Sequence, residues 1–396
     1  MIVHSYYEED PRVRREAEAL VARGREVDVF ALRRPGDGPA GIVSGVGLRR
    51  INVQRHQGAS LWVYLREYLT FLFKSSWALA RAHHRRGYGA VQVHSLPDFL
   101  VFAAVPLKLR GVPVILDLHE AMPEFFRTRF PRLDNRIVHR ALLLQERVSI
   151  AFGDRVFDVN ELMADRLLEL GVRADKLTIV PNSPNLDLFD PAGHARRAFR
   201  GDGSLRVVYT GALTPTYELD VAVDAIARLA VDRPDLDIRL ELYGRGDSET
   251  SLREQAARRG IADRVIFHGR IPIEDVPAAV AAADLGIAPT RLDRFTAVSL
   301  STKVFEYGAM GKPVVASRLP LVERTFSPDT VLTYPSGSAA ELAAGIARLA
   351  DDPLEREARI ARTAARVREL GWAREADRYA AFVEGLVGDA AAPPPS

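Results

Sequence analysis

The sequence lacks cysteine, any large net charge and any long apolar run. Without cysteine there can be no disulfide, thiol nucleophile or cysteine-ligated metal. A formal net charge of +2 over 396 residues gives no overall attraction to nucleic acid, so no such partner is expected. The longest apolar run, 99–107, ends at Lys108 and is too short to span a bilayer.

Several catalytic signatures are absent as well. The sequence has neither a G-x-S-x-G motif nor a P-loop, and no His/Asp/Glu cluster has the spacing of metal ligands. No metal or other cofactor is therefore expected. The first residues, M-I-V-H-S-Y-Y, lack the basic region and apolar run of a signal peptide, so we expect a cytoplasmic enzyme.

The sequence does contain a regular alternation of strands and helices. Its 396 residues suffice for two domains, and 47% hydrophobic with 27% charged residues is typical of globular proteins. The alternation predicts an α/β fold with two doubly wound, Rossmann-like parallel-sheet domains. Strands are expected at 2–4, 26–32, 48–53, 90–94, 113–117, 155–160, 177–180, 206–210, 237–243, 264–268, 285–288, from 313, and at 331–334. The main helices are expected at 10–23, 61–86, 97–110, 134–152, 163–171, 219–230, 251–259, 273–283, from 339, and at 373–387.

The alternation is interrupted by a polar segment. Residues 187–203 contain proline, glycines and several arginines, and are interpreted as a linker. The first domain would then be 1–186 and the second 204–372. Residues 389–396, D-A-A-A-P-P-P-S, are expected to form a disordered tail because of their composition.

One stretch, 299–317, combines a loop, a short helix and the start of a buried strand. Ser301 or Thr302 can cap the helix with a side-chain oxygen. Glu306 is the unusual polar residue on this apolar helix, and Lys303 lies in the first turn.

Two interpretations of this stretch remain open. The helix start offers free N–H groups to phosphates, and Glu306 could accept bonds from vicinal ribose hydroxyls. The stretch would then bind a nucleotide. Alternatively, it is a helix–strand connector that ends at Gly311, with Glu306 in a salt bridge.

Residues directly after the strands are candidates for binding, because ligands of open α/β sheets bind outside the carboxyl ends of the strands. In the first half these positions hold hydrogen-bonding or titratable side chains: Tyr6, His94, His119, Glu120 and Asn160. In the second half they hold glycines and cations, which suit phosphates: Gly211, Gly244, Arg245 and Arg270. His119 could bind a sugar or phosphate oxygen, or it could be a structural histidine bonded to Asp117.

The expected helix 61–86 has a second possible role. It carries Trp62, Leu65, Leu69, Phe73 and Trp77, followed by the basic end 81–86. An amphipathic, basic helix suits an anionic membrane surface. A core helix with a solvated basic end would explain the same pattern.

Seven short motifs follow one another along nearly the whole chain. They are D-P-R-V-R-R-E-A-E-A-L-V-A-R-G at 10–24, V-H-S-L-P-D-F-L at 93–100, D-L-H-E at 117–120, V-P-N-S-P-N at 180–185, Y-T-G-A-L at 209–213, F-H-G-R-I at 267–271 and S-T-K-V-F-E-Y-G-A-M-G-K-P-V-V-A at 301–316. This ordered set resembles the retaining GT-B glycosyltransferases of family 4. It is specific for the family and not for a substrate.

The resemblance implies two Rossmann-like domains facing a cleft, with the C-terminal helix, 373–388, crossing back to the first domain. A nucleotide-sugar donor would bind the second domain and the acceptor mainly the first. Carried over to this sequence, Glu306 would hold the ribose and the Gly211 loop would face the diphosphate. His119 would face the transferred sugar, and Arg270–Ile271 would lie against the base. Lys303 near the phosphates follows from its place in the first helical turn, not from the resemblance.

The sequence departs from the family pattern at three positions. Val298 stands where the family commonly has a second glutamate that touches sugar hydroxyls. Ala212 and Tyr217, in and after the donor loop, stand where it commonly has an arginine and a lysine for the diphosphate. The cations that remain for that role are Lys303, Arg245 and Arg270.

We therefore expect a retaining transferase that moves a sugar from a nucleotide diphosphate sugar to an acceptor hydroxyl. His119, Lys303 and Glu306 are the catalytic candidates. The expected setting is cell-envelope polysaccharide or lipid-linked glycan synthesis, with a glycan or lipid-linked acceptor and an anionic surface at the inner face of the cell membrane. Three alternatives stay open: a nucleotide-sugar epimerase on the same fold, a non-catalytic partner of another transferase, and a transferase that makes a small glycoside or sugar phosphate.

Overall fold

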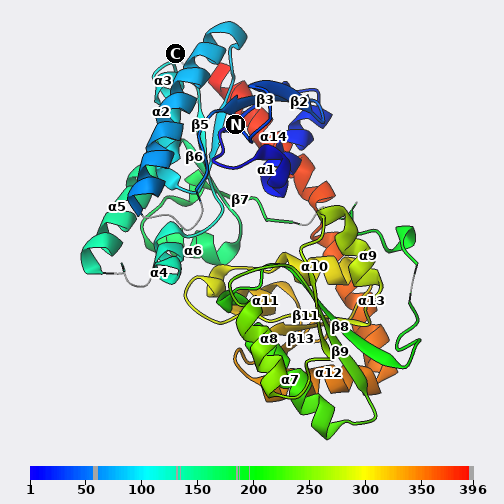
Figure 1. Ribbon diagram of the computed structural model, residues 1–396. Coiled ribbons are helices and arrows are strands. Elements are labelled where there is room, and N and C mark those ends of the chain that lie inside the picture. The colour runs from blue at the N-terminus through cyan, green and yellow to red at the C-terminus, as the bar shows by residue number, and fades with distance from the viewer. Residues whose placement is uncertain are drawn as a thin grey trace. The chain divides into compact units, whose positions relative to one another are not determined.

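The computed structural model describes residues 1–56, 61–130, 133, 135–183, 186, 188–195 and 197–391 (Figure 1). The chain divides into two compact units. The first contains Met1–Asn182 together with the chain from Ala373 onward, and the second contains Ser183–Trp372. In both units helices surround sheets in which parallel pairing dominates, which confirms the predicted α/β class.

The strands of the first unit form two sheets. One has the order β1-β3-β2 and the other the order β4-β5-β6-β7. Their bounds are β1 (Asp28–Leu32), β2 (Ala40–Val43), β3 (Val46–Ile51), β4 (Val91–His94), β5 (Val114–Leu118), β6 (Arg155–Asp158) and β7 (Leu177–Ile179). The strand expected at 2–4 is reduced to parallel bridges from Ile2 to Phe30 and Val93, which connect the two sheets.

An antiparallel hairpin, β2–β3, occupies a segment whose first half carried no predicted strand. Ser44 and Gly45 form its turn with φ of 49° and 79°. Two positive φ values in succession give a turn whose twist matches that of the flanking strands. The glycines and proline before it obscured β2 in the sequence.

The helices of the first unit are α1 (Pro11–Ala22), α2 (Leu61–Arg86), α3 (Val105–Lys108), α4 (Met122–Arg129), α5 (Arg136–Phe152), α6 (Glu161–Glu169) and α14 (Trp372–Ala391). The helix expected at 97–110 begins as a 3-10 segment, η2 (Asp98–Ala104), because Pro106 cannot donate a backbone hydrogen bond in a continuous helix. α14 includes the first three residues of the expected tail, and 392–396 lie outside the described residues.

The second unit has one six-stranded parallel sheet in the order β10-β9-β8-β11-β12-β13. The bounds are β8 (Ser204–Thr210), β9 (Asp237–Tyr243), β10 (Val265–Gly269), β11 (Leu285–Ala288), β12 (Val314–Ser317) and β13 (Leu332–Tyr334). The strand order reverses between β8 and β11. Such a switch point opens a crevice at the carboxyl ends of the strands, which is where this fold binds ligands.

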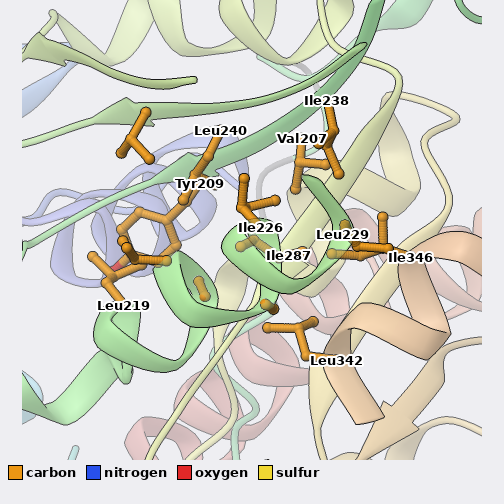
Figure 2. Packing of buried hydrophobic residues seen from close by; sticks show 14 of the residues in the cluster. Val207, Tyr209, Leu219, Ile226, Leu229, Ile238, Leu240, Ile287, Leu342 and Ile346 are labelled. Atoms are coloured by element: carbon orange, nitrogen blue, oxygen red, sulfur yellow. The ribbon is translucent and has the colours of Figure 1, made fainter. Parts of the chain in front are cut away.

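The helices of the second unit are α7 (Leu219–Asp232), α8 (Glu249–Arg258), α9 (Val276–Ala281), α10 (Thr302–Ala309), α11 (Pro320–Thr325), α12 (Ala339–Asp351) and α13 (Pro353–Glu369). Figure 2 shows Ile226 of α7 and Leu342 of α12 packed with Leu240 and Ile287 of the sheet. Each such side chain stabilises the fold by about 1.5–3 kcal/mol when fully buried. In the segment interpreted as a linker, Phe189 is buried in the core of this unit.

No helix in the described part of the chain is long and apolar enough to cross a membrane.

Candidate active site

In the second unit, glycines let the loops after β8 and β9 touch. The Gly211 N–H donates to the Tyr243 carbonyl at 2.8 Å. A Cβ on Gly244 would lie 1.8 Å from the Gly211 carbonyl oxygen, and one on Gly246 would lie 2.2 Å from the Leu213 oxygen. These distances are far below van der Waals contact, so the backbone forms a surface that side chains would fill. Such bare backbone allows a bulky anionic group to approach closely.

Lys303 lies directly against this glycine loop. A Cβ on Gly211 would be 2.6 Å from Lys303 Cε. The Lys303 ammonium lies 4.1 Å from the ring centre of Tyr217 and 5.1 Å from that of Tyr209. The side chain is only 8% exposed, and no salt bridge involves it among the described residues. Its charge acts on the Glu306 carboxyl one turn away, but that carboxyl is not at salt-bridge distance, so this buried cation can still receive an anion.

Glu306 lies one turn further along α10 and is half-buried. Burial raises the pKa of its carboxyl, while the charge of Lys303 and a hydrogen bond from Thr302 act in the opposite direction. Ser301 occupies the N-cap position, but its side chain makes no capping bond. Ser301 therefore does not cap the helix as predicted, and Thr302, the other candidate, is the first residue of α10 and bonds to Glu306. The first-turn N–H groups therefore receive no cap from the Ser301 side chain.

The loop that carries Tyr217 is held by its neighbour Glu218. Glu218 adopts a left-handed conformation, with φ 37° and ψ 39°. Its carboxylate accepts a bond from the Ser336 hydroxyl at 3.0 Å and one from the Gly337 N–H at 2.9 Å. This clamp fixes the ring of Tyr217 beside Lys303. Nothing in the local sequence signalled the clamp, because its partners lie more than a hundred residues away.

The other predicted donor residues lie at the rim of these loops. Ala212 is exposed, and its carbonyl accepts the Tyr209 hydroxyl at 2.8 Å. The side chains of Arg245 and Arg270 are exposed and form no ion pair within the described ranges. Ile271 packs on the apolar cluster beneath. Lys303 is therefore the buried cation of the set, and the two arginines are solvated.

In the first unit, β4 and β5 bring His94, Asp117 and His119 together. His94 and Asp117 are register partners at the strand ends. The Asp117 Oδ2 atom lies 2.9 Å from His94 Nδ1 and 3.4 Å from His119 Nε2. All three side chains are buried, and His94 Nε2 and His119 Nδ1 have no hydrogen-bond partner in the part of the chain that the structure describes.

The spacing of these three residues in the sequence did not signal a cluster, because register pairing and not chain distance unites them. Their donor atoms lie within 4.8 Å of one another, and two imidazoles with a carboxylate are a set that could ligate a divalent ion. The same atoms already contact one another, because His94 Nδ1 also lies 3.1 Å from His119 Nε2. The expectation that the site needs no metal stays a prediction.

Burial controls the protonation of this cluster. Burial lowers the pKa of His119, which keeps its ring neutral near pH 7, although Asp117 acts to raise it. Burial also acts to raise the pKa of Asp117, but the two histidines outweigh it and hold that pKa well below the usual range. Burial raises the pKa of Glu120 against the opposing charge of Arg12.

Two further acceptor-side candidates, Asn160 and Tyr6, have contacts with residues outside this cluster. Asn160 Oδ1 accepts the Met163 N–H at 2.9 Å and caps α6. The Arg55 guanidinium lies 5.8 Å from the ring centre of Tyr6. Asn160 thus has a structural function that its position after β6 did not reveal.

Comparison with solved structures identifies the architecture. Sucrose-phosphate synthase from Thermosynechococcus elongatus has a TM-score of 0.76 at 20% identity, over 96% of this chain and 93% of that one. HepE from Anabaena in complex with UDP-glucose has a TM-score of 0.70 at 15% identity, over 97% and 98%. With two Rossmann-like units and these neighbours, the protein has the GT-B fold.

Sequence comparison identifies the family. Residues 10–183 match the description "Glycosyl transferase 4-like domain", and residues 204–352 match "Glycosyl transferases group 1". A D-inositol 3-phosphate glycosyltransferase from Pseudarthrobacter chlorophenolicus is 26% identical over 95% of this chain and 90% of its own length. The chain belongs to the family 4 type of GT-B glycosyltransferases and is an enzyme of that class. The resemblance inferred from the seven motifs is thereby confirmed.

Proposed function

We propose that the protein transfers a sugar from a nucleotide diphosphate sugar to an acceptor hydroxyl with retention of configuration. The second unit would bind the donor, and the first unit would supply the acceptor side. The setting we propose is the synthesis of a cell-envelope polysaccharide or a lipid-linked glycan.

One observation carries the donor assignment: the buried Lys303 ammonium, which forms no salt bridge among the described residues, lies beside the Gly211 loop and one helical turn from Glu306. The ammonium and the start of α10 suit a diphosphate. A carboxylate one turn further along suits the two hydroxyls of a ribose. HepE, a neighbour in fold, is known in complex with UDP-glucose, which supports the same ligand class here.

The proposed chemistry requires no metal. The bond between the anomeric carbon and the diphosphate oxygen breaks as the acceptor oxygen bonds to the same face of that carbon. The transition state has oxocarbenium character, and the departing diphosphate oxygen takes the proton of the acceptor hydroxyl. Lys303 stabilises the negative charge that develops on the diphosphate. Lys303 would thus supply the positive charge for the diphosphate that Ala212 and Tyr217 cannot supply.

Calorimetric titration with a panel of nucleoside diphosphates and their sugars tests the donor assignment. We expect Lys303→Met to weaken binding of the best nucleotide by about 10- to 100-fold, the value of one charge-assisted hydrogen bond. Glu306→Gln should weaken the binding of nucleotides more than the binding of inorganic pyrophosphate, because Glu306 is proposed to contact the ribose, which pyrophosphate lacks. Equal affinities of wild type and Lys303→Met would refute the assignment.

A second buried lysine provides the matched control. Lys312 Nζ donates to the carbonyls of Ala281 and Ala283 at 2.8 and 2.6 Å, so its cation is already satisfied by the fold. Lys312→Met should lower the melting temperature and leave the nucleotide affinity of the folded protein unchanged. Nucleotide release that depends on an added acceptor would distinguish transfer from epimerisation.

We further propose that the first unit binds an anionic membrane surface. The exposed faces of α2 and α5 form what we term the α2–α5 surface, which consists of Trp62, Leu65, Arg66, Leu69, Phe73, Lys74, Trp77, Arg81, Arg85, Arg136, Ile137, Arg140, Leu144, Arg147 and Val148. Both helices pack on η2 and lie on one side of this unit (Figure 1). Trp62 and Ile137, one on each helix, are 79% and 81% exposed.

The charge distribution supports a membrane over a protein core as the partner. α2 and α5 each contain a single acidic residue, Glu67 and Glu146, and both are buried. Glu67 pairs with His4 at 3.1 Å, and Glu146 pairs with Arg166 at 2.8 Å. The exposed charge of both helices is therefore entirely basic. Aromatic side chains flanked by cations are the pattern of interfacial helices at anionic lipid.

Vesicle sedimentation tests this surface. We expect binding to vesicles that contain phosphatidylglycerol and little binding to phosphatidylcholine alone. The double variant Trp62→Ser/Trp77→Ser should lose most of the binding, whereas Leu354→Ser, on an exposed site of α13, should not. Equal sedimentation of the double variant and the wild type would refute the proposal.

A further inference from the structure

The C-terminal helix α14 is connected to the buried His94–Asp117–His119 cluster through the side chains of Tyr379 and Gln92. Tyr379 of α14 is buried, and its hydroxyl donates to Gln92 Oε1 at 2.6 Å. Gln92 lies in β4, two residues before His94. A contact across 287 residues of sequence thus ties the last helix of the chain to the strand that carries a site histidine.

The Gln92 amide transmits this contact to Asp117. Its Nε2 donates to Asp117 Oδ2 at 2.8 Å and to Glu16 Oε2 at 2.6 Å. Because Nε2 faces two carboxyl groups, Oε1 must face Tyr379, and the orientation of the amide is determined. If the Tyr379 hydroxyl is removed, Oε1 loses its donor and the amide can rotate away from Asp117.

Asp117 in turn orients His119. Its Oδ2 lies 3.4 Å from His119 Nε2 and 2.9 Å from His94 Nδ1, and these two ring nitrogens lie 3.1 Å apart. The backbone N–H of His119 donates to Ser95 Oγ at 3.0 Å, so the main chain of this residue is fixed independently of its ring. With Nε2 turned to the carboxylate, Nδ1 is the ring atom left without a partner among the described residues. In the neutral ring Nδ1 then carries the lone pair and can accept a bond from a hydroxyl.

We propose that Tyr379 is a positioning residue: through Gln92 and Asp117, α14 sets the tautomer and ring orientation of His119, so that Nδ1 is presented as an acceptor to a ligand hydroxyl. That the hydroxyl belongs to the transferred sugar rests on the proposed function. The positioning itself does not depend on it.

Nitrogen-15 NMR of the histidine rings in the full chain measures this positioning directly. We expect Tyr379→Phe to move the Nδ1 and Nε2 resonances of His119 towards values averaged over two tautomers. The substituted ring still packs on Phe157, whose centre lies 5.8 Å away. Turnover should fall about tenfold, with little change in KM for the donor, since one net hydrogen bond is removed from the chain.

A second residue of α14 provides the control. Phe382 also packs on Phe157, at 5.4 Å between ring centres, but forms no part of the hydrogen-bond chain. Phe382→Leu should lower the melting temperature and leave the His119 resonances unmoved. In a double-mutant cycle, Tyr379→Phe and Gln92→Leu should be strongly non-additive, because both break one chain.

Three results would overturn the proposal. They are unchanged His119 resonances in Tyr379→Phe, equal changes in Phe382→Leu, or a wild-type spectrum that changes on addition of EDTA, which would mean that a metal ion orients the ring. If the resonances move and turnover does not, the positioning stands and the role of His119 in the proposed reaction fails.

Discussion

The two units present opposite chemistry at the carboxyl ends of their strands. In the second unit the loops after β8 and β9 are nearly bare backbone, with one buried cation beside them. In the first unit the ends of β4 and β5 carry a dense network of buried imidazole, amide and carboxyl groups. In the second unit the surface therefore depends on the close packing of glycine backbone. In the first unit it depends on the protonation states of buried side chains.

The difference follows from what each surface must do under the proposed function. A diphosphate is large and always charged, so it needs room and a cation, which glycine and lysine supply. A sugar hydroxyl is neutral and directional, so it needs an acceptor with a defined tautomer, which a buried histidine beside a carboxylate supplies. The four predictions below test this contrast.

The shape of the second unit should be intolerant of a single methyl group at Gly244. Its φ is 151°, and a Cβ would lie 1.8 Å from the Gly211 oxygen. We expect Gly244→Ala to lower the free energy of unfolding by roughly 3 kcal/mol, from strained backbone and overpacking. Urea denaturation measures the change.

Gly260 provides the control for backbone strain alone. Its φ is 71°, and a Cβ there would meet nothing within 4 Å. Gly260→Ala should cost about 1 kcal/mol. Equal stability of the two variants would contradict the close approach of the loops after β8 and β9.

In the first unit, the protonation of the buried Asp98 should make the free energy of unfolding depend on pH. Burial raises the pKa of its carboxyl to about 8. The folded state therefore keeps a proton that the unfolded state loses above about pH 4, and stability falls as pH rises. This group alone should lower the free energy of unfolding by about 1.4 kcal/mol per pH unit between about pH 4 and pH 8.

Asp98→Asn isolates that contribution, because the amide is neutral at every pH. The difference in unfolding free energy between variant and wild type should grow with pH up to about 8 and then level off. Asp263→Asn, at an exposed position, should leave the pH dependence unchanged. A pH-independent difference for Asp98→Asn would show that the carboxyl is ionised in the folded protein.

Tyr217 should contribute a smaller, specific effect to donor binding. Its ring lies 4.1 Å from the Lys303 ammonium. A partly buried cation–π contact contributes about 1 kcal/mol, so Tyr217→Leu should weaken nucleotide affinity about fivefold. Tyr217→Phe keeps the ring and should bind as the wild type does. If calorimetry gives the two variants the same nucleotide affinity, the aromatic ring of Tyr217 does not contribute to donor binding.

The smallest effect on stability is expected on the α2–α5 surface. Phe73 is 68% exposed, whereas Phe71 on the same helix is fully buried. Phe73→Ser should change the unfolding free energy by less than about 0.5 kcal/mol, whereas Phe71→Ser should cost about 3–5 kcal/mol. Thermal denaturation compares them. A large loss at Phe73 would mean that this face packs against the protein instead of remaining available to lipid.

Local patterns sufficed wherever structure depends on neighbours in the chain. The apolar spacing of 61–86 predicted α2 with both ends correct. Gly311 has φ 66° after α10, as a helix terminator requires. Where proline removes a donor the prediction was less accurate, as at η2, because a 3-10 turn and an α-helix have the same sequence signal over a few residues.

The sequence by itself determined the two alternating series, and therefore the fold class, the glycines at the strand ends and the family. Only the tertiary structure decided which residues act together. Register pairing of β4 with β5 joined His94 to Asp117, the Glu218 clamp placed Tyr217 on Lys303, and α14 brought Tyr379 to Gln92. These contacts depend on packing between segments far apart in the chain, and no local periodicity encodes them. The sequence alone therefore could not predict these three contacts.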